Sequence, residues 1–386
     1  MKEQSRHAIL KHDLETVRQN QKVIVRRLNC GGDDELVTWS LLHAHLHQRL
    51  KAQPVQPLSS HPSGVAIATP LLPAQAKVLI AVSGGQDSQC LLRLLTDLQK
   101  QWQWQLYAIH CNHGWRADAA ANAAFVSQLT ADWGVHCMVE TATLSSRSEA
   151  AARQWRYQTF GRMAQQLGCS HVVTGHTASD RAETLLFNLV RGSGLEGLQA
   201  LGWQRPLSPE HPAIALTRPL LDITRAQTGN FCQQFDIPVW EDSTNRDRHY
   251  RRNRMRLDVL PILSTHFNPQ VEATLAQTAE LLTAEGAYLT AEADRLYELT
   301  VLNDRLQRRS LRSSPLALQR RVIRRWLQPY VLTSLRFDHV EKVIKLLYAS
   351  NRSQTDPFPG GAIARVDDPW ICLMDLPEVA TRHPSQ

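Results

Sequence analysis

Short apolar runs alternate with longer stretches of helical periodicity between residues 77 and 190. The apolar runs predict four strands, at Val78–Val82, Leu106–His110, Val135–Val139 and His171–Thr174. The stretches that follow them predict four helices, at Ser88–Leu98, Ala117–Asp132, Glu149–Gln166 and Asp180–Val190. This alternation is typical of an α/β fold built on a parallel sheet, in which ligands bind at the carboxyl ends of the strands.

The segments before this region have a different pattern. Residues 1–36 are polar and weakly periodic, and we expect a disordered or poorly packed leader there. An apolar repeat in residues 37–50 predicts a short amphipathic helix whose polar face carries His43, His45 and His47. A spacing of two places neighbouring side chains on different helix faces, so we expect exposed histidines rather than a metal site. Prolines throughout 51–74 predict an extended linker.

The carboxyl half is mainly helical in its pattern. Pro261 and Pro269 bracket a predicted break, and Val271–Leu299 predicts a long connecting helix. A later helix has one apolar face and one arginine-rich face; the apolar residues are Leu318, Val322, Ile323, Trp326 and Leu327. We therefore expect a leader at 1–36, a short helix and linker at 37–74, an α/β domain at 75–265, a connecting helix at 266–300, and a smaller, basic, mainly helical domain with a few late strands at 301–386.

Composition narrows the class of protein. A chain of 386 residues is longer than one ordinary domain, and no apolar stretch approaches the roughly 18 residues of a membrane span. No secretory signal is recognisable, so we expect a cytoplasmic protein without membrane contact. The seven cysteines include no CxxC pair, which favours reduced, mostly buried thiols. Lysine and arginine outnumber acidic residues by 43 to 36, and this excess favours a polyanionic partner.

A glycine-rich loop joins the first predicted strand to its helix, with the sequence Ser83-Gly84-Gly85-Gln86-Asp87-Ser88. The glycines let the backbone turn sharply and present N–H donors to one anion, and the helix amino end adds about half a positive charge. The loop lacks the lysine of a Walker loop, so transfer of a γ-phosphate is not expected. A carboxylate beside phosphates would repel them unless it binds Mg²⁺, which makes Asp87 the candidate metal ligand. A simple turn capped by Ser83 and Ser88 is the alternative.

Further polar blocks follow later strands and helices. They are His110–Arg116, Arg153–Tyr157, Thr174–Thr184, Leu189–Leu198, Arg218–Leu221, Glu241–Asn245 and Tyr250–Arg256. Asp180 and Glu183 lie three residues apart on one predicted helix, as a carboxylate pair suited to a metal or an ammonium group. An ion pair with Arg181 or with nearby bases is the alternative. Six arginines lie between positions 246 and 256, where spacing alone also fits a solvated face.

In order and spacing, the SGGxDS loop and these blocks resemble the lysidine synthetases of the PP-loop superfamily, from about Val78 to Pro269. Two positions depart from the family pattern. Trp115 replaces a usual leucine, which affects packing more than chemistry. Ser179 replaces the first of two aspartates in the GHxxDDxxET block, which puts in doubt any mechanism that requires both. A later helix at Pro315–Leu327 resembles the tRNA-binding appendage of the same family.

The resemblance implies roles for particular residues. The implied ATP-binding residues are Ser83, Gly84, Gly85, Gln86, Asp87, Ser88, His110 and Gly175, with Mg²⁺ on Asp87. The implied catalytic residues are Asp87, His176, Asp180 and Glu183. The implied tRNA-binding residues are Arg153, Arg156, Arg251, Arg252, Arg254, Arg256, Arg320 and Arg321.

The resemblance also implies a reaction. ATP adenylates O2 of the wobble cytidine of a CAU-anticodon tRNA(Ile), pyrophosphate leaves, and the side-chain amine of free lysine attacks C2 and expels AMP. The product reads AUA instead of AUG. Because an amine with a pKa of about 10.4 is protonated at neutral pH, some group must take its proton. Asp180, His176 and Glu183 are candidates by position, and none is preferred.

Three other functions fit part of the pattern. A thiocytidine synthetase or another sulfur-transfer relative shares the loop, but uses a persulfide or a cysteine-bound iron–sulfur cluster, for which no CxxC is present. A tRNA-binding protein without catalysis would keep the basic surface but not a complete phosphate loop. A small-molecule amidotransferase-type synthetase would not need a basic carboxyl domain. The sequence leaves open whether the chain forms a homodimer.

Overall fold

The computed structural model describes residues 24–25, 38–51, 70–115, 117–142, 148–241, 247–249, 251–331 and 335–374. The chain divides into two compact units. The first comprises residues 1–55 and 68–283, and the second comprises residues 56–67 and 284–386. Among the described residues, no helix is both long and apolar enough to cross a membrane.

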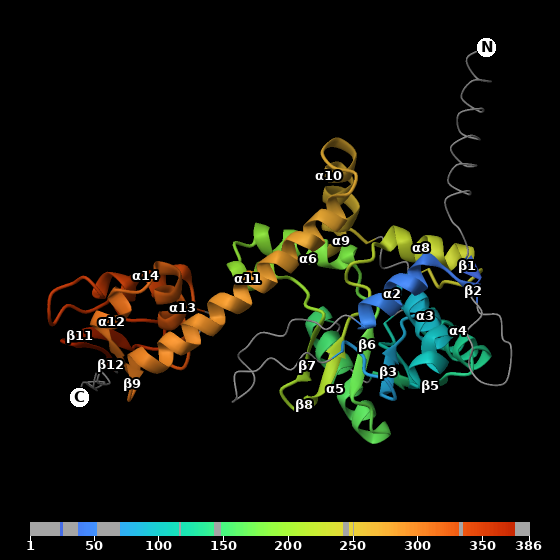
Figure 1. Cartoon of the computed structure of the whole chain (residues 1–386), viewed down its shortest axis with the longest axis horizontal. Coiled ribbons are helices and arrows are strands. Elements are labelled where there is room, and N and C mark those ends of the chain that lie inside the picture. The colour runs from blue at the N-terminus through green and yellow to red at the C-terminus, as the bar shows by residue number, and fades with distance from the viewer. Residues whose placement is uncertain are drawn as a thin grey trace, which may run out of the picture. The chain divides into compact units, whose positions relative to one another are not determined.

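A six-stranded sheet forms the centre of the first unit, with the strand order β5-β4-β3-β6-β8-β7 (Figure 1). The strands are β3 (Lys77–Ala81), β4 (Gln105–Asn112), β5 (His136–Thr141), β6 (His171–Thr174), β7 (Gln204–Ser208) and β8 (His211–Thr217). Neighbouring strands run parallel from β5 to β8, and β7 pairs antiparallel with β8. The predicted α/β fold with a parallel sheet is confirmed, and each of the four predicted strands is present.

The helices that accompany this sheet are α3 (Gln86–Trp102), α4 (Ala119–Asp132), α5 (Glu149–Leu167), α6 (Ala178–Val190), α7 (Leu195–Leu198) and α8 (Arg225–Gln234). α3, α4 and α8 pack in the apolar cluster on one face of the sheet, and α5 packs in the cluster on the other. Successive residues of β3 point to opposite layers: Val78 and Ile80 pack in one apolar cluster with α3, and Leu79 packs in another with α5. All three side chains are fully buried, as expected for a central parallel strand.

The hairpin of β7 and β8 and the helix α8 complete this fold and were absent from the sequence prediction. β7 reads Gln-Arg-Pro-Leu-Ser and buries a single residue, so it lacks an alternating apolar pattern. α8 reads Arg-Ala-Gln-Thr-Gly-Asn-Phe-Cys-Gln-Gln and likewise offers little apolar periodicity. Both elements depend on neighbours that are distant in the sequence.

The helix α2 (Leu41–Lys51) corrects the prediction of three exposed histidines. His43 is fully buried, and its Nε2 lies 2.9 Å from Asp97 Oδ2 on α3. His45 is about half exposed and lies 3.0 Å from Asp222 Oδ2. The prediction is therefore wrong for His43, because the packing of α2 against α3 gives a buried imidazole a carboxylate partner.

Part of the predicted leader forms a strand. β1 (Ile24–Val25) pairs antiparallel with β2 (Thr38–Trp39). The other positions of the leader up to residue 36, and residues 52–69 of the predicted linker, lie outside the described residues.

The helices after the sheet begin with the arginine run. α9 (Arg251–Arg254), a π-helical turn (Met255–Val259) and α10 (Leu260–His266) follow one another. Pro261 lies in the first turn of α10, where a missing N–H is tolerated, so the predicted break begins only after His266. α11 (Val271–Thr300) confirms the predicted long helix.

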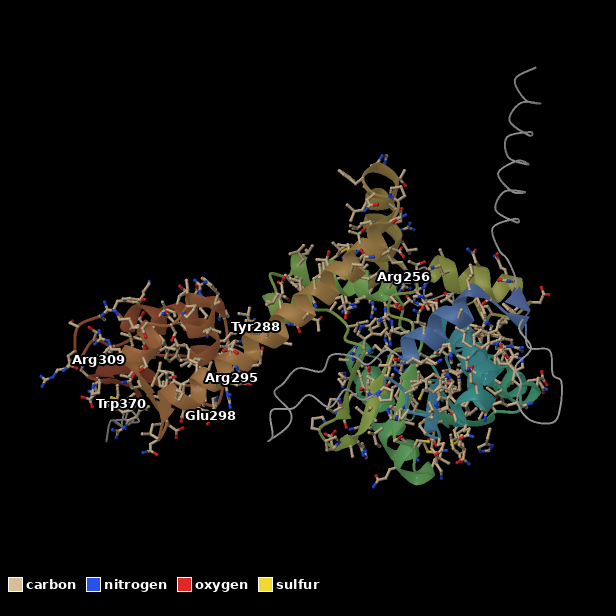
Figure 2. All side chains as sticks on the ribbon, viewed as in Figure 1. Arg256, Tyr288, Arg295, Glu298, Arg309 and Trp370 are labelled. Atoms are coloured by element: carbon tan, nitrogen blue, oxygen red, sulfur yellow. The ribbon has the colours of Figure 1, made fainter. Side chains whose placement is uncertain are left out.

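The second unit combines an antiparallel sheet with short helices. Its described elements are β9 (Val301–Leu302), β10 (Arg305–Gln307), α12 (Arg308–Arg312), α13 (Leu316–Leu327), α14 (Phe337–Leu346), β11 (Ile363–Asp367) and β12 (Trp370–Met374). The strand order is β11-β12-β10-β9. Trp370, which opens β12, is labelled among the side chains in Figure 2. α13 buries Val322, Ile323, Trp326 and Leu327, which confirms its predicted apolar face.

Candidate active site

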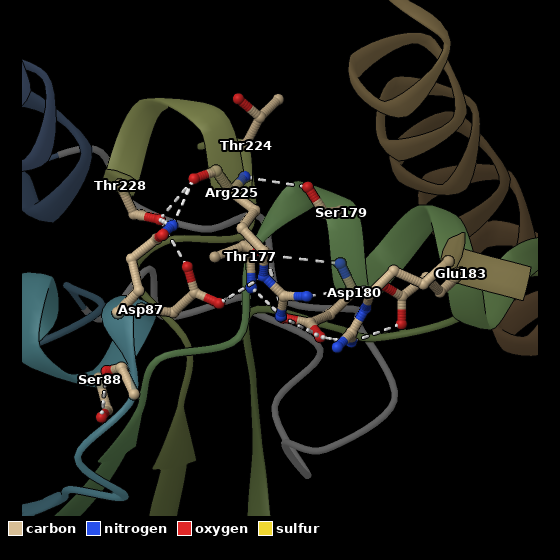
Figure 3. A network of polar contacts seen from close by, with 12 residues as sticks. Asp87, Ser88, Thr177, Ser179, Asp180, Glu183, Thr224, Arg225 and Thr228 are labelled. Atoms are coloured by element: carbon tan, nitrogen blue, oxygen red, sulfur yellow. Dashed lines mark hydrogen bonds and ion pairs between the residues drawn. The ribbon is translucent and has the colours of Figure 1, made fainter. Parts of the chain in front are cut away.

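Three segments that are far apart in the sequence meet at the carboxyl edge of the sheet (Figure 3). The loop after β3 leads to Asp87, the turn after β6 leads to Asp180, and the turn after β8 leads to Arg225. β3, β6 and β8 are consecutive in the sheet and parallel, so their carboxyl ends lie side by side. This edge is the candidate active site.

Two glycines allow these segments to approach one another. Gly84 has a φ of +91°, and a Cβ at this position would lie 2.4 Å from Asn122 Oδ1. A Cβ at Gly175 would lie 2.9 Å from the backbone oxygen of Asp87. A side chain at Gly175 would therefore push the turn after β6 away from the loop after β3.

The amino end of α3 has no side-chain cap. Its N-cap residue is Gly85, and Ser83 Oγ and Ser88 Oγ lie 3.1 Å from each other. Ser88 Oγ also donates to the carbonyl oxygen of Gly85 at 2.8 Å. The serines thus hold the loop in shape without capping the first-turn amides of the helix, which is the arrangement that an anion requires. The alternative of a simple turn capped by Ser83 and Ser88 explains only the hydrogen bonds inside the loop.

Asp87 points from the first turn of α3 toward α8 (Figure 3). Its Oδ1 accepts a hydrogen bond from Thr228 Oγ1 at 2.5 Å, and its Oδ2 accepts one from Arg225 Nε at 2.9 Å. Burial raises the pKa of Asp87, while Arg225 and Thr228 oppose the shift. Within the described part of the chain, no group of three His, Cys, Asp or Glu side chains could hold a metal.

Asp180 and Glu183 share a buried network with three arginines (Figure 3). Glu183, whose side chain is 0% exposed, accepts hydrogen bonds from Arg252 Nε at 3.1 Å and Arg256 Nε at 2.5 Å. Asp180 Oδ1 lies 3.4 Å from Arg252 Nη2 and 3.5 Å from Arg225 Nη2. The carboxylate pair therefore makes ion pairs with other bases, and the carboxylates are buried while the arginines are partly exposed.

Arg181 does not take part in this network. It is 2% exposed, and its Nη1 donates to Glu280 at 2.7 Å on α11. Arg181 is therefore not a partner of the carboxylate pair, whereas other arginines are. Successive residues of a helix point in different directions, so Arg181 faces α11 while Asp180 faces α8.

Asp180 is ionised despite its burial. Burial alone would raise its pKa, but Arg225, His176 and Arg252 outweigh this effect and lower the pKa to about 2. Its Oδ2 accepts the backbone N–H of Thr177 at 2.9 Å, which completes the capping box of α6. One oxygen of Asp180 therefore holds the helix start, and the other faces the arginines.

The two histidines implied at this edge are held by oxygen atoms. His176 Nδ1 lies 2.8 Å from Thr174 Oγ1, and burial lowers the pKa of His176 to about 3, with Asp180 opposing the shift. His110 is buried, and its Nδ1 lies 2.8 Å from the carbonyl oxygen of Val82, directly before the glycine-rich loop. His176 is therefore neutral at physiological pH.

The arginine run divides into two sets. Arg252 and Arg256 face Asp180 and Glu183 as described above; Arg256 is labelled in Figure 2. Arg251 and Arg254 are exposed. Residues 242–246 and 250 lie outside the described residues. Helical spacing explains the division, since residues four apart share a face.

A second basic cluster surrounds Tyr157 on α5. The guanidinium group of Arg153 lies 5.4 Å from the ring centroid, and that of Arg205 lies 5.2 Å from it. Arg218 is buried, and its Nη1 donates to the carbonyl oxygen of Gly202 at 2.7 Å. Burial would raise the pKa of Tyr157, but the surrounding arginines lower it; they are Arg153, Arg218, Arg205 and Arg156.

The implied arginines of the second unit lie on α13. Arg320 Nε donates to Glu341 at 2.7 Å, and its guanidinium group lies 5.2 Å from the Phe337 ring centroid. Arg321 Nη1 lies 3.4 Å from Thr290 Oγ1. Both side chains are partly exposed.

Sequence reasoning missed Arg225 and Thr228, which hold Asp87. A signal was present, because Thr224 and Gln227 have the spacing of a capping box, and the structure contains this box at the start of α8. It places a helix start at Arg225 but cannot reveal that the side chain reaches Asp87, which is 138 residues away.

Comparisons with known proteins agree with this geometry. A PP-loop domain model matches residues 60–263, and a TilS substrate binding domain model matches residues 306–368. The tRNA(Ile)-lysidine synthase of Nostoc sp. is 49% identical, covering 87% of this chain and 98% of that protein. The tRNA(Ile)-lysidine synthase of Synechocystis sp. is 46% identical, with coverage of 87% and 98%. The chloroplastic tRNA(Ile)-lysidine synthase of Zygnema circumcarinatum is 35% identical, with coverage of 72% and 76%. On these matches, and with a PP-loop at the carboxyl edge of its sheet, the chain belongs to the tRNA(Ile)-lysidine synthase family.

Proposed function

We propose that the protein joins free lysine to C2 of the wobble cytidine of a CAU-anticodon tRNA(Ile), while ATP is converted to AMP and pyrophosphate. One observation carries the proposal: the uncapped amino end of α3 lies beside Asp87 and the buried charge network, at the edge where parallel sheets bind ligands. Relatives named for this activity match the chain over most of its length.

The ATP phosphates would bind to the backbone amides of the glycine-rich loop. The proposed ATP-binding residues remain Ser83, Gly84, Gly85, Gln86, Asp87, Ser88, His110 and Gly175. Asp87 fits a Mg²⁺ ion, because this ion is commonly held by one or two carboxylates together with phosphate and water oxygens. When bound, the ion neutralises phosphate charge and polarises a phosphoryl oxygen. Arg225 and Thr228 would hold the Asp87 carboxylate in a fixed position.

The side-chain amine of the substrate lysine would bind near the carboxylates of Asp180 and Glu183. Two of the candidate bases are weak, since the pKa of Asp180 is about 2 and that of His176 is about 3. A group this acidic accepts a proton poorly from an ammonium ion with a pKa of about 10.4. We therefore assign Asp180 the role of holding and orienting the ammonium group by charge, with Glu183 keeping the arginines in place. The proton would pass to solvent.

The tRNA would bind through arginines of both units. Arg251 and Arg254 are exposed, whereas the charges of Arg252 and Arg256 are largely compensated by Asp180 and Glu183. The remaining proposed contacts are Arg153, Arg156, Arg320 and Arg321. We assign the tRNA binding of the second unit mainly to residues 301–386. We also propose that the reaction takes place in the cytoplasm.

A thiocytidine synthetase is the less favoured function. Three of the described cysteines, Cys90, Cys169 and Cys232, are buried. Burial raises the pKa of Cys169 to about 11 and that of Cys232 to about 12, which suppresses the thiolate form that sulfur chemistry needs.

The test is mass analysis of tRNA(Ile) after incubation with the full chain, ATP and isotope-labelled lysine. We expect label in one anticodon nucleoside, with one AMP released for each lysine incorporated. Omitting lysine should give tRNA that lacks the mass increment of lysine. Incorporation of sulfur, or release of AMP without transfer of label to tRNA, would overturn the proposal.

A further inference from the structure

Ser179 occupies the position at which the family pattern has an aspartate, and its hydroxyl group makes two hydrogen bonds. Its oxygen accepts the backbone N–H of Arg225 at 2.9 Å (Figure 3). Its proton is donated to the carboxylate of Glu272, in the first turn of α11. A carboxylate therefore lies beside residue 179 after all, but a different helix supplies it.

We propose that Glu272 is a positioning residue of the ATP site, which acts through Ser179 and Arg225 on Asp87. The inference rests on the proposed function only because it takes Asp87 to be part of the ATP site. Glu272 itself touches neither ATP nor RNA in this account.

The path from Glu272 to Asp87 consists of four groups in contact. A serine hydroxyl has one proton, so donating it to Glu272 leaves the oxygen lone pairs for the N–H of Arg225. This N–H belongs to the first residue of α8, which an intrahelical bond cannot satisfy. The side chain of the same residue then reaches Asp87 Oδ2 at 2.9 Å and Asp180 Oδ1 at 3.5 Å. Fixing the start of α8 therefore fixes the guanidinium group between the two carboxylates.

A second carboxylate of α11 provides a matched comparison. Glu280 accepts hydrogen bonds from Arg181 Nη1 at 2.7 Å and from Trp203 Nε1 at 2.9 Å. It therefore also joins α11 to α6, but its contacts do not lead to Arg225 or Asp87. The partner of Glu272 is in turn bonded to Arg225, whereas the partners of Glu280 are not. Comparing variants of the two glutamates therefore distinguishes a positioning role from a packing role.

The first experiment compares Glu272→Ala with Glu280→Ala in the full chain. We expect Glu272→Ala to lower kcat for ATP–pyrophosphate exchange about tenfold, with little change in the affinity for tRNA(Ile). Glu272→Gln should keep most of the activity, because its amide oxygen still accepts the serine proton. Glu280→Ala should lower the melting temperature without lowering kcat at a temperature where the variant is folded. Equal loss of kcat in both alanine variants would reduce Glu272 to a packing residue.

The second experiment moves the carboxylate back to position 179. Ser179→Asp alone sets two carboxylates against each other and should lower exchange more than about tenfold. Adding Glu272→Ser to Ser179→Asp exchanges the positions of the hydroxyl and the carboxylate and should restore kcat to within about threefold of the original chain. A double variant no better than Ser179→Asp would overturn the proposal, as would full activity of Ser179→Asp alone. These outcomes are separate from the proposed function, which fails instead if Asp87→Ala retains exchange.

Discussion

Arginines of the first and second units are held in opposite ways. In the first unit, Arg225, Arg252 and Arg256 surround buried carboxylates at the end of the sheet. On α13 of the second unit, Arg320 pairs with Glu341, and Arg325 pairs with Asp294 and Glu298, all of which are partly or largely exposed. Buried groups lose solvation and must be matched closely, whereas exposed pairs are screened and contribute little. The same residue type therefore builds an internal scaffold in one unit and a basic face in the other.

The largest expected effect comes from Asp87, where the buried network meets the phosphate loop. Asp87→Ala should lower ATP–pyrophosphate exchange at least about a hundredfold, because it removes the metal ligand and the partner of Arg225. Arg320→Ala in the second unit should retain exchange at saturating tRNA. Circular dichroism should show both variants folded. Unchanged exchange in Asp87→Ala would remove the glycine-rich loop from the active site.

Glu183 tests the energetic side of the comparison. Glu183→Gln removes the carboxylate closest to Arg252 and Arg256 and leaves them only the longer contacts to Asp180. It should destabilise the first unit by about 2 kcal/mol in urea unfolding, since part of each guanidinium group is solvated. The matched change in the second unit is Glu341→Gln, which frees Arg320 and should cost less than about 0.5 kcal/mol. Equal effects would mean that burial does not distinguish the two sets of ion pairs.

Salt dependence of tRNA binding tests which arginines of the run meet phosphates. Replacing Arg251 and Arg254 by alanine should lower the slope of log Kd against log salt concentration by about two, because each phosphate contact releases about one counter-ion. Replacing Arg252 and Arg256 should lower this slope by less, since acidic residues already compensate their charges, and should instead reduce exchange. Identical slopes for the original chain and the first variant would assign Arg251 and Arg254 to a solvated face.

The smallest effect is expected at the half-exposed His45. The hydrogen bond to Asp222 raises the pKa of His45. Its stabilisation is therefore complete below the unfolded pKa of about 6.5 and is lost as pH rises through the folded value. His45→Asn should remove this pH dependence of the melting temperature between about pH 6 and 8, with a difference below about 1 kcal/mol. A pH profile that is the same with and without His45 would contradict this assignment.

Much of the first unit followed from local pattern. The central strands β3 and β6 are apolar runs buried on both faces, and α3 and α6 have clear helical periodicity. β7 and α8 lack such patterns, because their few buried residues depend on neighbours in space. His43 was misjudged for the same reason, since only the packing of α2 onto α3 brings Asp97 to its imidazole ring.

The sequence by itself determined the α/β class, the glycine-rich turn before α3 and the presence of acidic and basic groups, because these depend on composition, periodicity and backbone freedom over a few residues. The tertiary structure alone decided their pairing. Arg256 meets Glu183 across 73 residues of chain, and Arg225 meets Asp87 across 138. Such contacts depend on which strands lie side by side and on which face each helix presents, and no local spacing encodes either.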